Sequence, residues 1–188
     1  MNFIGFNKHY NLEGLHAPFS PSQSSWLRYD KEKAARVYLN KKAVAMGTRY
    51  HAWAKETIDL GIKQRKSKDT LSAYVNDAIK YKMSTEVVLY YSDRFFGTAD
   101  AISFRNNVLR IHDLKTGAIP ASMEQLMIYA ALFCLEYGIK PGNIDISLAI
   151  YQSDEVLTHT PTADEIAPIM DQIVTLDKTL RNIDMQED

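Results

Sequence analysis

The sequence predicts an α/β protein of the α+β type, with a central mixed sheet of about four to five strands flanked by helices. Three observations predict it. Apolar residues recur at helical spacing through much of residues 1–82, which we expect to be mainly helical. Residues 83–152 hold short runs rich in β-branched and aromatic residues around one helical segment, and are expected to form the sheet core. A last helical pattern covers residues 162–183.

The length and composition predict one domain. A chain of 188 residues, 46% of them hydrophobic, can bury a core large enough to fold without disulfides or a structural metal. We find no repeat and no linker long enough to divide it. We therefore expect a single domain over residues 1–188.

Three helices are expected in the N-terminal part. The first begins after Ser20-Pro21, because serine caps a helix and proline fits its first turn. Whether it continues or restarts through Tyr38 is left open by the pattern. A second helix runs from about Val44 to Leu60 and ends at Gly61, and a third covers about Asp69 to Lys80.

Strands dominate the second part of the chain. The densest signal is a β-hairpin over about Phe95 to Thr116, whose turn is Asn106-Asn107, a pair that tolerates positive φ angles. The other expected elements are a strand at Ser84–Tyr91, a helix at about Ser122–Tyr137, a strand at Ile144–Tyr151 and a helix from Pro161 to about Ile183.

Composition narrows the class of protein. Cys134 stands alone in an apolar helical run, which excludes a disulfide framework and a four-cysteine cluster. The first residues lack the pattern of a signal peptide, and no run of about 18 apolar residues is present. We therefore expect a soluble, cytoplasmic protein that makes no membrane contact.

Charge is unevenly placed along the chain. The net charge of −1 disfavours a surface that grips nucleic acid all round, since phosphate binding depends on Lys and Arg. Positive residues nevertheless gather between Lys31 and Arg49 and between Lys63 and Lys68, whereas acidic residues dominate after Asp154. This pattern fits a local phosphate-binding groove, and fits ordinary solvated helix faces equally well.

The predicted hairpin carries the most informative polar residues. Asp100 and Asp113 lie one on each strand among apolar neighbours, and Lys115 follows Asp113 by two positions, so these last two side chains should share a face. Carboxylates on neighbouring strands suit a hard cation such as Mg²⁺, and a lysine beside them suits a phosphate group. The alternative is a cross-strand salt bridge on a solvated face.

Two helical patterns add to the hairpin. Gln125 and Tyr129 stand four residues apart on a predicted helix, so they share a face from which they could bond a phosphate or the lysine. His51, in the run 47–51, could complete a metal site as a nitrogen ligand. Taken alone, the first pattern is an ordinary helix face and the second an ordinary helical histidine.

The order of these motifs resembles the RecB-like branch of the PD-(D/E)XK nuclease superfamily. The motifs are Gly-Thr-x-x-His at 47–51, Gly-Thr-Ala-Asp at 97–100, Asp-Leu-Lys-Thr at 113–116 and Gln-x-x-x-Tyr at 125–129. The run Ser-Pro-Ser-Gln-x-x-Trp-Leu at 20–27 is similar to one in phage-encoded members, and the resemblance covers about residues 20–129. It implies a restriction-endonuclease-like core with an N-terminal helical region.

The resemblance also implies a set of metal ligands. One or two Mg²⁺ or Mn²⁺ ions would be bound by His51, Asp100, Asp113 and the main-chain carbonyl of Leu114. Glu86 matches an acidic residue often found at its position, and is equally compatible with a glutamate on a strand surface. Glu56 is a weaker candidate ligand because, five residues after His51, it points elsewhere on the helix.

The remaining matches imply catalytic roles. Lys115 would be the catalytic lysine, and Gln125 and Tyr129 would hold the substrate beside Asp100 and Asp113. Candidate DNA contacts are Lys41, Lys42 and Arg49. Some family members carry an iron–sulfur cluster on four cysteines, which the single cysteine excludes here.

The implied function is metal-dependent hydrolysis of DNA phosphodiester bonds, expected of an exonuclease that acts on DNA ends in phage recombination or repair. The alternatives are a structure-specific endonuclease and a non-catalytic DNA-end-binding module. The expected partners are DNA, a DNA-annealing recombination protein and further copies of the chain. If the chain is phage-encoded, its compartment is the cytoplasm of the host cell.

Overall fold

The computed structural model describes residue 10, residues 17–117 and residues 121–187, so that residues 1–9 and 11–16 of the predicted helical part lie outside it. The chain divides into two compact units, residues 1–46 and 47–188. The predicted α+β class is confirmed, with a mixed sheet of five strands and helices around it. Among the described residues, no helix has the length and apolar character needed to cross a membrane.

Residues 1–46 hold the 3-10 helix η2 (Pro21–Arg28) and the first part of α1 (Lys31–Asp59). The helix predicted after Ser20 is 3-10 rather than α, and it has a kink at Gln23, which leaves helical geometry at φ −117° and ψ 64°. No Gly or Pro interrupts residues 31–46, and α1 is therefore one continuous helix of 29 residues instead of two. It ends at Asp59, two residues before the predicted stop, Gly61, whose φ is +67°.

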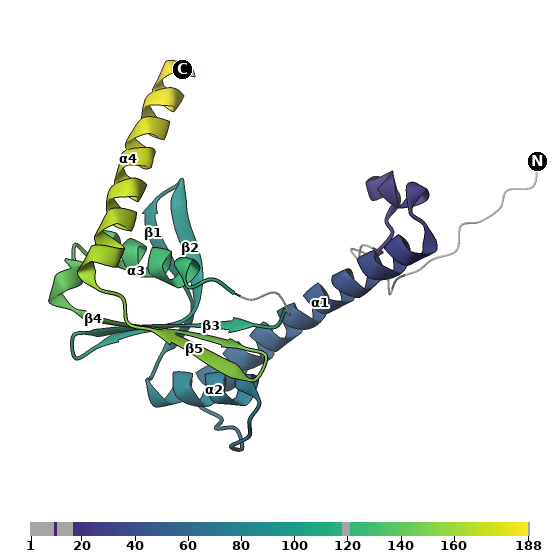
Figure 1. Ribbon diagram of the computed structural model, residues 1–188, viewed down its shortest axis with the longest axis horizontal. Helices are drawn as coiled ribbons and strands as arrows, with labels where there is room; N and C mark the ends of the chain where they lie inside the picture. Colours follow the sequence, from purple (N-terminus) through teal and green to yellow (C-terminus); the bar gives the residue numbers. More distant parts are fainter. Residues whose placement is uncertain (1–9, 11–16, 118–120, 188) are drawn as a thin grey trace, which may run out of the picture. The chain divides into compact units, whose positions relative to one another are not determined.

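The sheet has the strand order β1 (Ser84–Ser92), β2 (Phe95–Arg105), β3 (Val108–Lys115), β4 (Asp145–Gln152) and β5 (Glu155–His159) (Figure 1). The predicted hairpin is β2–β3, and Asn106 and Asn107 turn it with φ values of 50° and 63°. Strands β3 and β4 are parallel, joined through α3 (Glu124–Glu136), and the other neighbours are antiparallel. The edge strand β5 was not predicted.

Helices cover both faces of the sheet (Figure 1). On one face α3 and α4 (Ala163–Glu187) build a core that includes Leu126, Leu109 and Ile111, all fully buried. On the other face, α2 (Thr70–Lys80) and the last turns of α1 pack against Leu114 and its neighbours. Each buried Leu or Ile contributes about 1.5–3 kcal/mol. The C-terminal end of β3 is thus held between two cores.

Candidate metal centre

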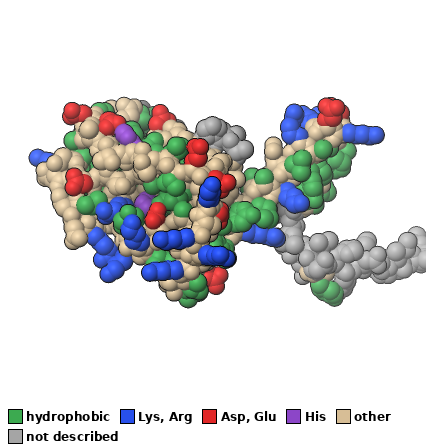
Figure 2. Space-filling view, turned by 60° about the horizontal axis from the view of Figure 1, so that its bottom comes forward, with side chains coloured by type: hydrophobic (Ala, Val, Ile, Leu, Met, Phe, Trp, Pro, Cys, Tyr) green, Lys and Arg blue, Asp and Glu red, His purple; other side chains and the backbone are tan. Residues whose placement is uncertain are grey.

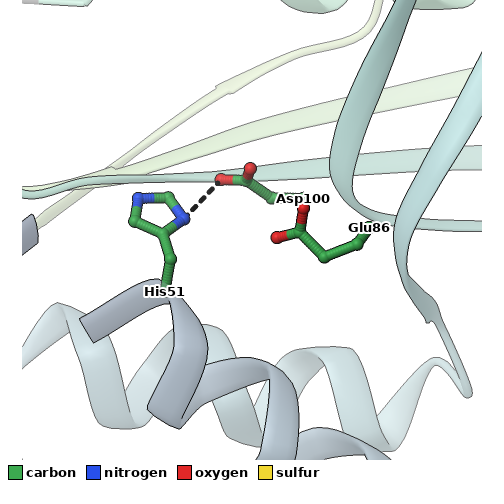
Figure 3. A group of neighbouring side chains, drawn as sticks. All are labelled: His51, Glu86 and Asp100. Carbon is green, nitrogen blue, oxygen red and sulfur yellow. Dashed lines mark ion pairs between the residues drawn. The ribbon is translucent and has the colours of Figure 1, made fainter. Parts of the chain in front are cut away.

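Three side chains from three different elements converge on the sheet (Figure 3). His51 comes from α1, Glu86 from β1 and Asp100 from β2, and in the figure they point toward one another. Each offers one ligand atom, and these atoms lie within 4.8 Å of one another. The Nδ1 atom of His51 is 3.4 Å from Oδ2 of Asp100.

A glycine brings α1 close enough for His51 to reach the strands. A Cβ atom on Gly47 would lie 2.7 Å from Oγ1 of Thr116, just past the end of β3, so no larger residue fits without movement. One helical turn later, His51 faces β2. Two turns further on, a hydrogen bond links α1 to β1: the Thr85 hydroxyl donates to Oδ1 of Asp59 at 2.7 Å.

Glu86 occupies a strained backbone position. Its φ is +51°, in the left-handed region that side chains other than glycine rarely adopt and that costs about 1–2 kcal/mol. The neighbouring pairs Thr85–Ala101 and Val87–Ala99 place Glu86 opposite Asp100. Backbone strain of this kind is often found at functional sites.

The half-buried Asp100 carboxylate is subject to several influences that shift its pKa in opposite directions. Burial is the largest of them and raises its pKa above the ordinary value, and the charges of Asp113 and Glu86 act in the same direction. The backbone N–H of Leu114, which donates to Oδ2 at 3.0 Å, and the nearby His51 act against this rise. A raised pKa means that the folded state loses stability as the pH rises through it and Asp100 ionises, a cost that a bound cation would offset.

The donor atoms fit a small divalent cation. Ligands on opposite sides of a six-coordinate Mg²⁺ lie about 4.2 Å apart, since each bond is about 2.1 Å. Ligands on adjacent positions lie about 3.0 Å apart, and at least two of the three pairs must be adjacent, so a spread of 4.8 Å requires the three side chains to close by up to about 2 Å. Two carboxylates and one imidazole suit Mg²⁺ or Mn²⁺ better than a soft metal.

A second group of polar residues lies at the end of β3. The prediction that Asp113 and Lys115 share a face is confirmed, since Nζ of Lys115 lies 3.1 Å from Oδ1 and 3.0 Å from Oδ2 of Asp113. Oδ2 is buried and accepts no well-aligned hydrogen bond from the described residues, so this oxygen could also serve a cation. Nζ of Lys115 also donates to Oε1 of Gln125 at 2.9 Å.

The helix pair extends this group across to β2. Nε2 of Gln125 donates to the Tyr129 hydroxyl at 3.2 Å, and that hydroxyl donates to the carbonyl of Thr98 at 2.7 Å. Gly97 makes room for the ring, because a Cβ atom there would lie 2.9 Å from Cε1 of Tyr129. Each of the two Gly-Thr motifs thus uses its glycine to seat an element of the site.

The two groups adjoin at Leu114. Its N–H donates to Asp100 of the first group, and its chain neighbours Asp113 and Lys115 belong to the second. The N–H and C=O of one strand residue face the same neighbouring strand, so the Leu114 carbonyl is also turned toward β2. The buried Tyr74 hydroxyl lies near both groups: burial raises its pKa most, followed by the charges of Asp100, Asp113 and Glu86.

Not every predicted residue lies in these groups. Glu56 is exposed on α1 and is not part of the ligand group. Arg49 is exposed on the same helix. Lys41 and Lys42 belong to residues 1–46, where Nζ of Lys41 donates to Oε1 of Gln23 at 3.1 Å.

Sequence reasoning undervalued Glu86, although a local signal could have ranked it higher. The turn at Asp93-Arg94 joins β1 to β2, and residues can be paired by counting away from it along both strands. When one extra position is allowed for the irregularity at Tyr90–Ser92, Glu86 pairs with Asp100. A carboxylate directly across the strand pair from a candidate ligand is a stronger candidate than a glutamate on an arbitrary strand surface.

Comparison with known proteins adds no relative: no protein-family model, curated protein or solved structure matches the chain.

Proposed function

We propose that the chain is a metal-dependent nuclease that hydrolyses phosphodiester bonds in DNA. The observation that carries the proposal is the hydrogen bond from Leu114 to Asp100. It joins a ligand group suited to a divalent cation directly to the residues on either side of Leu114, Asp113 and Lys115. A cation site beside a fixed ammonium group matches the charges of a phosphodiester.

His51, Glu86 and Asp100 would hold Mg²⁺ or Mn²⁺, and Asp113 offers a further carboxylate oxygen through Oδ2. An ion bound there would polarise the phosphate and lower the pKa of a coordinated water. The carboxylates of Glu86 and Asp100 lie close together, and their mutual repulsion favours binding of a cation.

Lys115 has one N–H donor available for a water molecule or a phosphate oxygen. An ammonium group has three N–H donors, and two are directed at Asp113 and Gln125. The third has no acceptor among the described residues, and the side chain is 31% exposed. It can orient a water nucleophile or donate to a phosphate oxygen, and Gln125 and Tyr129 keep it in place without reorganisation.

The resemblance to phage recombination exonucleases supports action on DNA ends, in recombination or repair. The test uses end-labelled linear duplex and a covalently closed circle, each with Mg²⁺, Mn²⁺ or EDTA. We expect metal-dependent loss of the linear DNA, abolished in Lys115→Ala and Asp113→Ala and unchanged in Lys178→Ala, an exposed lysine on α4.

Three results would contradict the proposal. Equal degradation by the native chain and by both site variants would show that the activity does not depend on Asp113 and Lys115. Degradation of the DNA in EDTA would show that the activity does not need a metal ion. Tight DNA binding without cleavage would support a non-catalytic module, whereas cutting of the closed circle would keep the nuclease but replace the exonuclease with an endonuclease.

A further inference from the structure

A second surface of the 47–188 unit gathers positive charge. A groove of about 660 Å³ opens between the end of α2 and the β2–β3 turn, and it is lined by Lys80, Tyr81, Lys82, Arg105, Asn106, Val108 and Arg110. Seen from the side of α2, this unit carries neighbouring Lys and Arg side chains (Figure 2). Four of the seven lining residues are cations and none is acidic.

Tyr81 organises two of the cations. Cζ of Arg110 lies 4.6 Å and Nζ of Lys80 4.7 Å from the centre of its ring. The ring also packs edge-on against His112, with centroids 5.8 Å apart. Lys80 and Arg110, which come from a helix and a strand, are thereby kept at the same groove.

The four cations lack acidic partners. Among the described residues, no carboxylate lies within ion-pair distance of Lys80, Lys82, Arg105 or Arg110. The nearby Asp77 instead accepts a hydrogen bond of 2.8 Å from the Tyr151 hydroxyl. Attraction to the C-terminal end of α2 explains the two lysines, but not the two arginines that the hairpin contributes.

Lys82 supplies a charge where glycine is the usual residue. It follows α2 with a φ of +51°, and the bond of 2.9 Å from the Met83 N–H to the Ala78 carbonyl closes the helix end around it. A lysine in this conformation costs about 1 kcal/mol relative to glycine. The position thus keeps a cation against its backbone preference.

We propose that this groove binds the phosphate backbone of the DNA whose neighbouring segment reaches the metal centre, an inference that rests on the proposed function. Arg105 follows Asp100 by five residues of β2, which corresponds to about 17 Å. A B-form strand spans that distance with about five nucleotides. The groove would therefore hold the duplex away from the bond that is cut.

The test measures binding without hydrolysis. A fluorescein-labelled duplex of about 20 base pairs is titrated with the chain in EDTA across a series of salt concentrations, and fluorescence anisotropy reports binding. Lys82→Asn/Arg105→Gln removes two exposed charges, and asparagine tolerates the positive φ. The matched control, Lys140→Gln/Lys178→Gln, removes two exposed charges elsewhere.

Each lost phosphate contact lowers the slope of log K against log salt by about 0.9. The magnitude of the slope should therefore be about 1.8 smaller for the groove variant than for the native chain. If the two proteins bind equally at 1 M salt, this difference makes the variant bind about 60-fold more weakly at 0.1 M salt. The control and the charge-conserving Lys82→Arg/Arg105→Lys should retain native affinity. Circular dichroism melts would check that each variant is folded.

An unchanged slope in the groove variant, or an equal loss in the control, would overturn the inference. The two proposals fail separately. A chain that binds DNA through the groove but does not cleave it refutes the nuclease alone, and a chain that cleaves DNA with groove-independent binding refutes the groove alone.

Discussion

Replacing Glu86 by Gln should stabilise the metal-free chain and weaken metal binding at the same time. Glu86 and Asp100 bring their oxygens within 4.8 Å, and the pKa of Asp100 is raised in part by Glu86. Glutamine keeps the size of the side chain and removes its charge. Like-charge repulsion disappears, but so does one anionic ligand.

The magnitude follows from the separation. Two unit charges 4.8 Å apart repel by about 1 kcal/mol in water and by about 3.5 kcal/mol at an effective dielectric constant of 20. Glu86 is exposed, so the lower value applies, and a chain of this length gains about 2–4 °C in Tm. A divalent ion at about 100 times its Kd should stabilise the native chain by about 2.7 kcal/mol, or about 5–10 °C.

The assay is thermal unfolding in EDTA and in millimolar Mn²⁺. We expect Glu86→Gln to melt above the native chain in EDTA and below it in Mn²⁺, so that the order of the two proteins reverses. Glu56→Gln, an exposed glutamate of α1 outside the ligand group, is the control and should change neither value. A lower Tm in EDTA, or a full Mn²⁺ shift in Glu86→Gln, would refute the reasoning.

Three further outcomes are expected. Gln125→Ala, which frees Lys115, should lower DNA hydrolysis about tenfold while leaving the Mn²⁺-induced Tm shift intact; loss of that shift would contradict a role confined to positioning the lysine. Gly97→Ala places a Cβ atom 2.9 Å from the Tyr129 ring and should cost about 1–3 kcal/mol in urea unfolding, a loss that adding Tyr129→Ala should partly reverse. Burial lowers the pKa of His112 to about 4 from an ordinary 6.5, so the unfolded chain takes up the proton first as the pH falls, and the free energy of unfolding should drop by about 3 kcal/mol over that interval. His112→Asn should flatten this dependence in urea titrations at successive pH values, and an unchanged slope would refute the assignment.

Local signals account for the elements that the sequence predicted. The paired Asn residues of the β2–β3 turn both adopt positive φ, and Asp69 caps α2 through the N–H groups of Leu71 and Ser72. Strand β5 has no comparable signal: most of its residues are exposed at the sheet edge, so no alternation of apolar and polar residues marks it. The 3-10 geometry of the helix after Ser20 was not predicted, because capping patterns do not distinguish a 3-10 helix from an α-helix.

The candidate site could be assembled from the sequence only in part. Spacing alone places Asp113 with Lys115, and Gln125 with Tyr129. No spacing rule joins His51 to Asp100, since a helix and a strand 49 positions apart meet only through the packing of α1 on the sheet. Counting back from the turn at Asp93-Arg94 pairs Glu86 with Asp100 only when the irregularity at Tyr90–Ser92 is allowed for, and that irregularity is a property of the folded strands.

The most direct measurement is a crystal structure with Mn²⁺, with anomalous diffraction collected to locate the ion. We expect an anomalous peak bonded at about 2.1 Å to a nitrogen of His51 and to carboxylate oxygens of Glu86 and Asp100, with Lys115 close by. Absence of a peak there at saturating Mn²⁺, or a peak bound only by other residues, would contradict the metal centre on which the proposed nuclease depends.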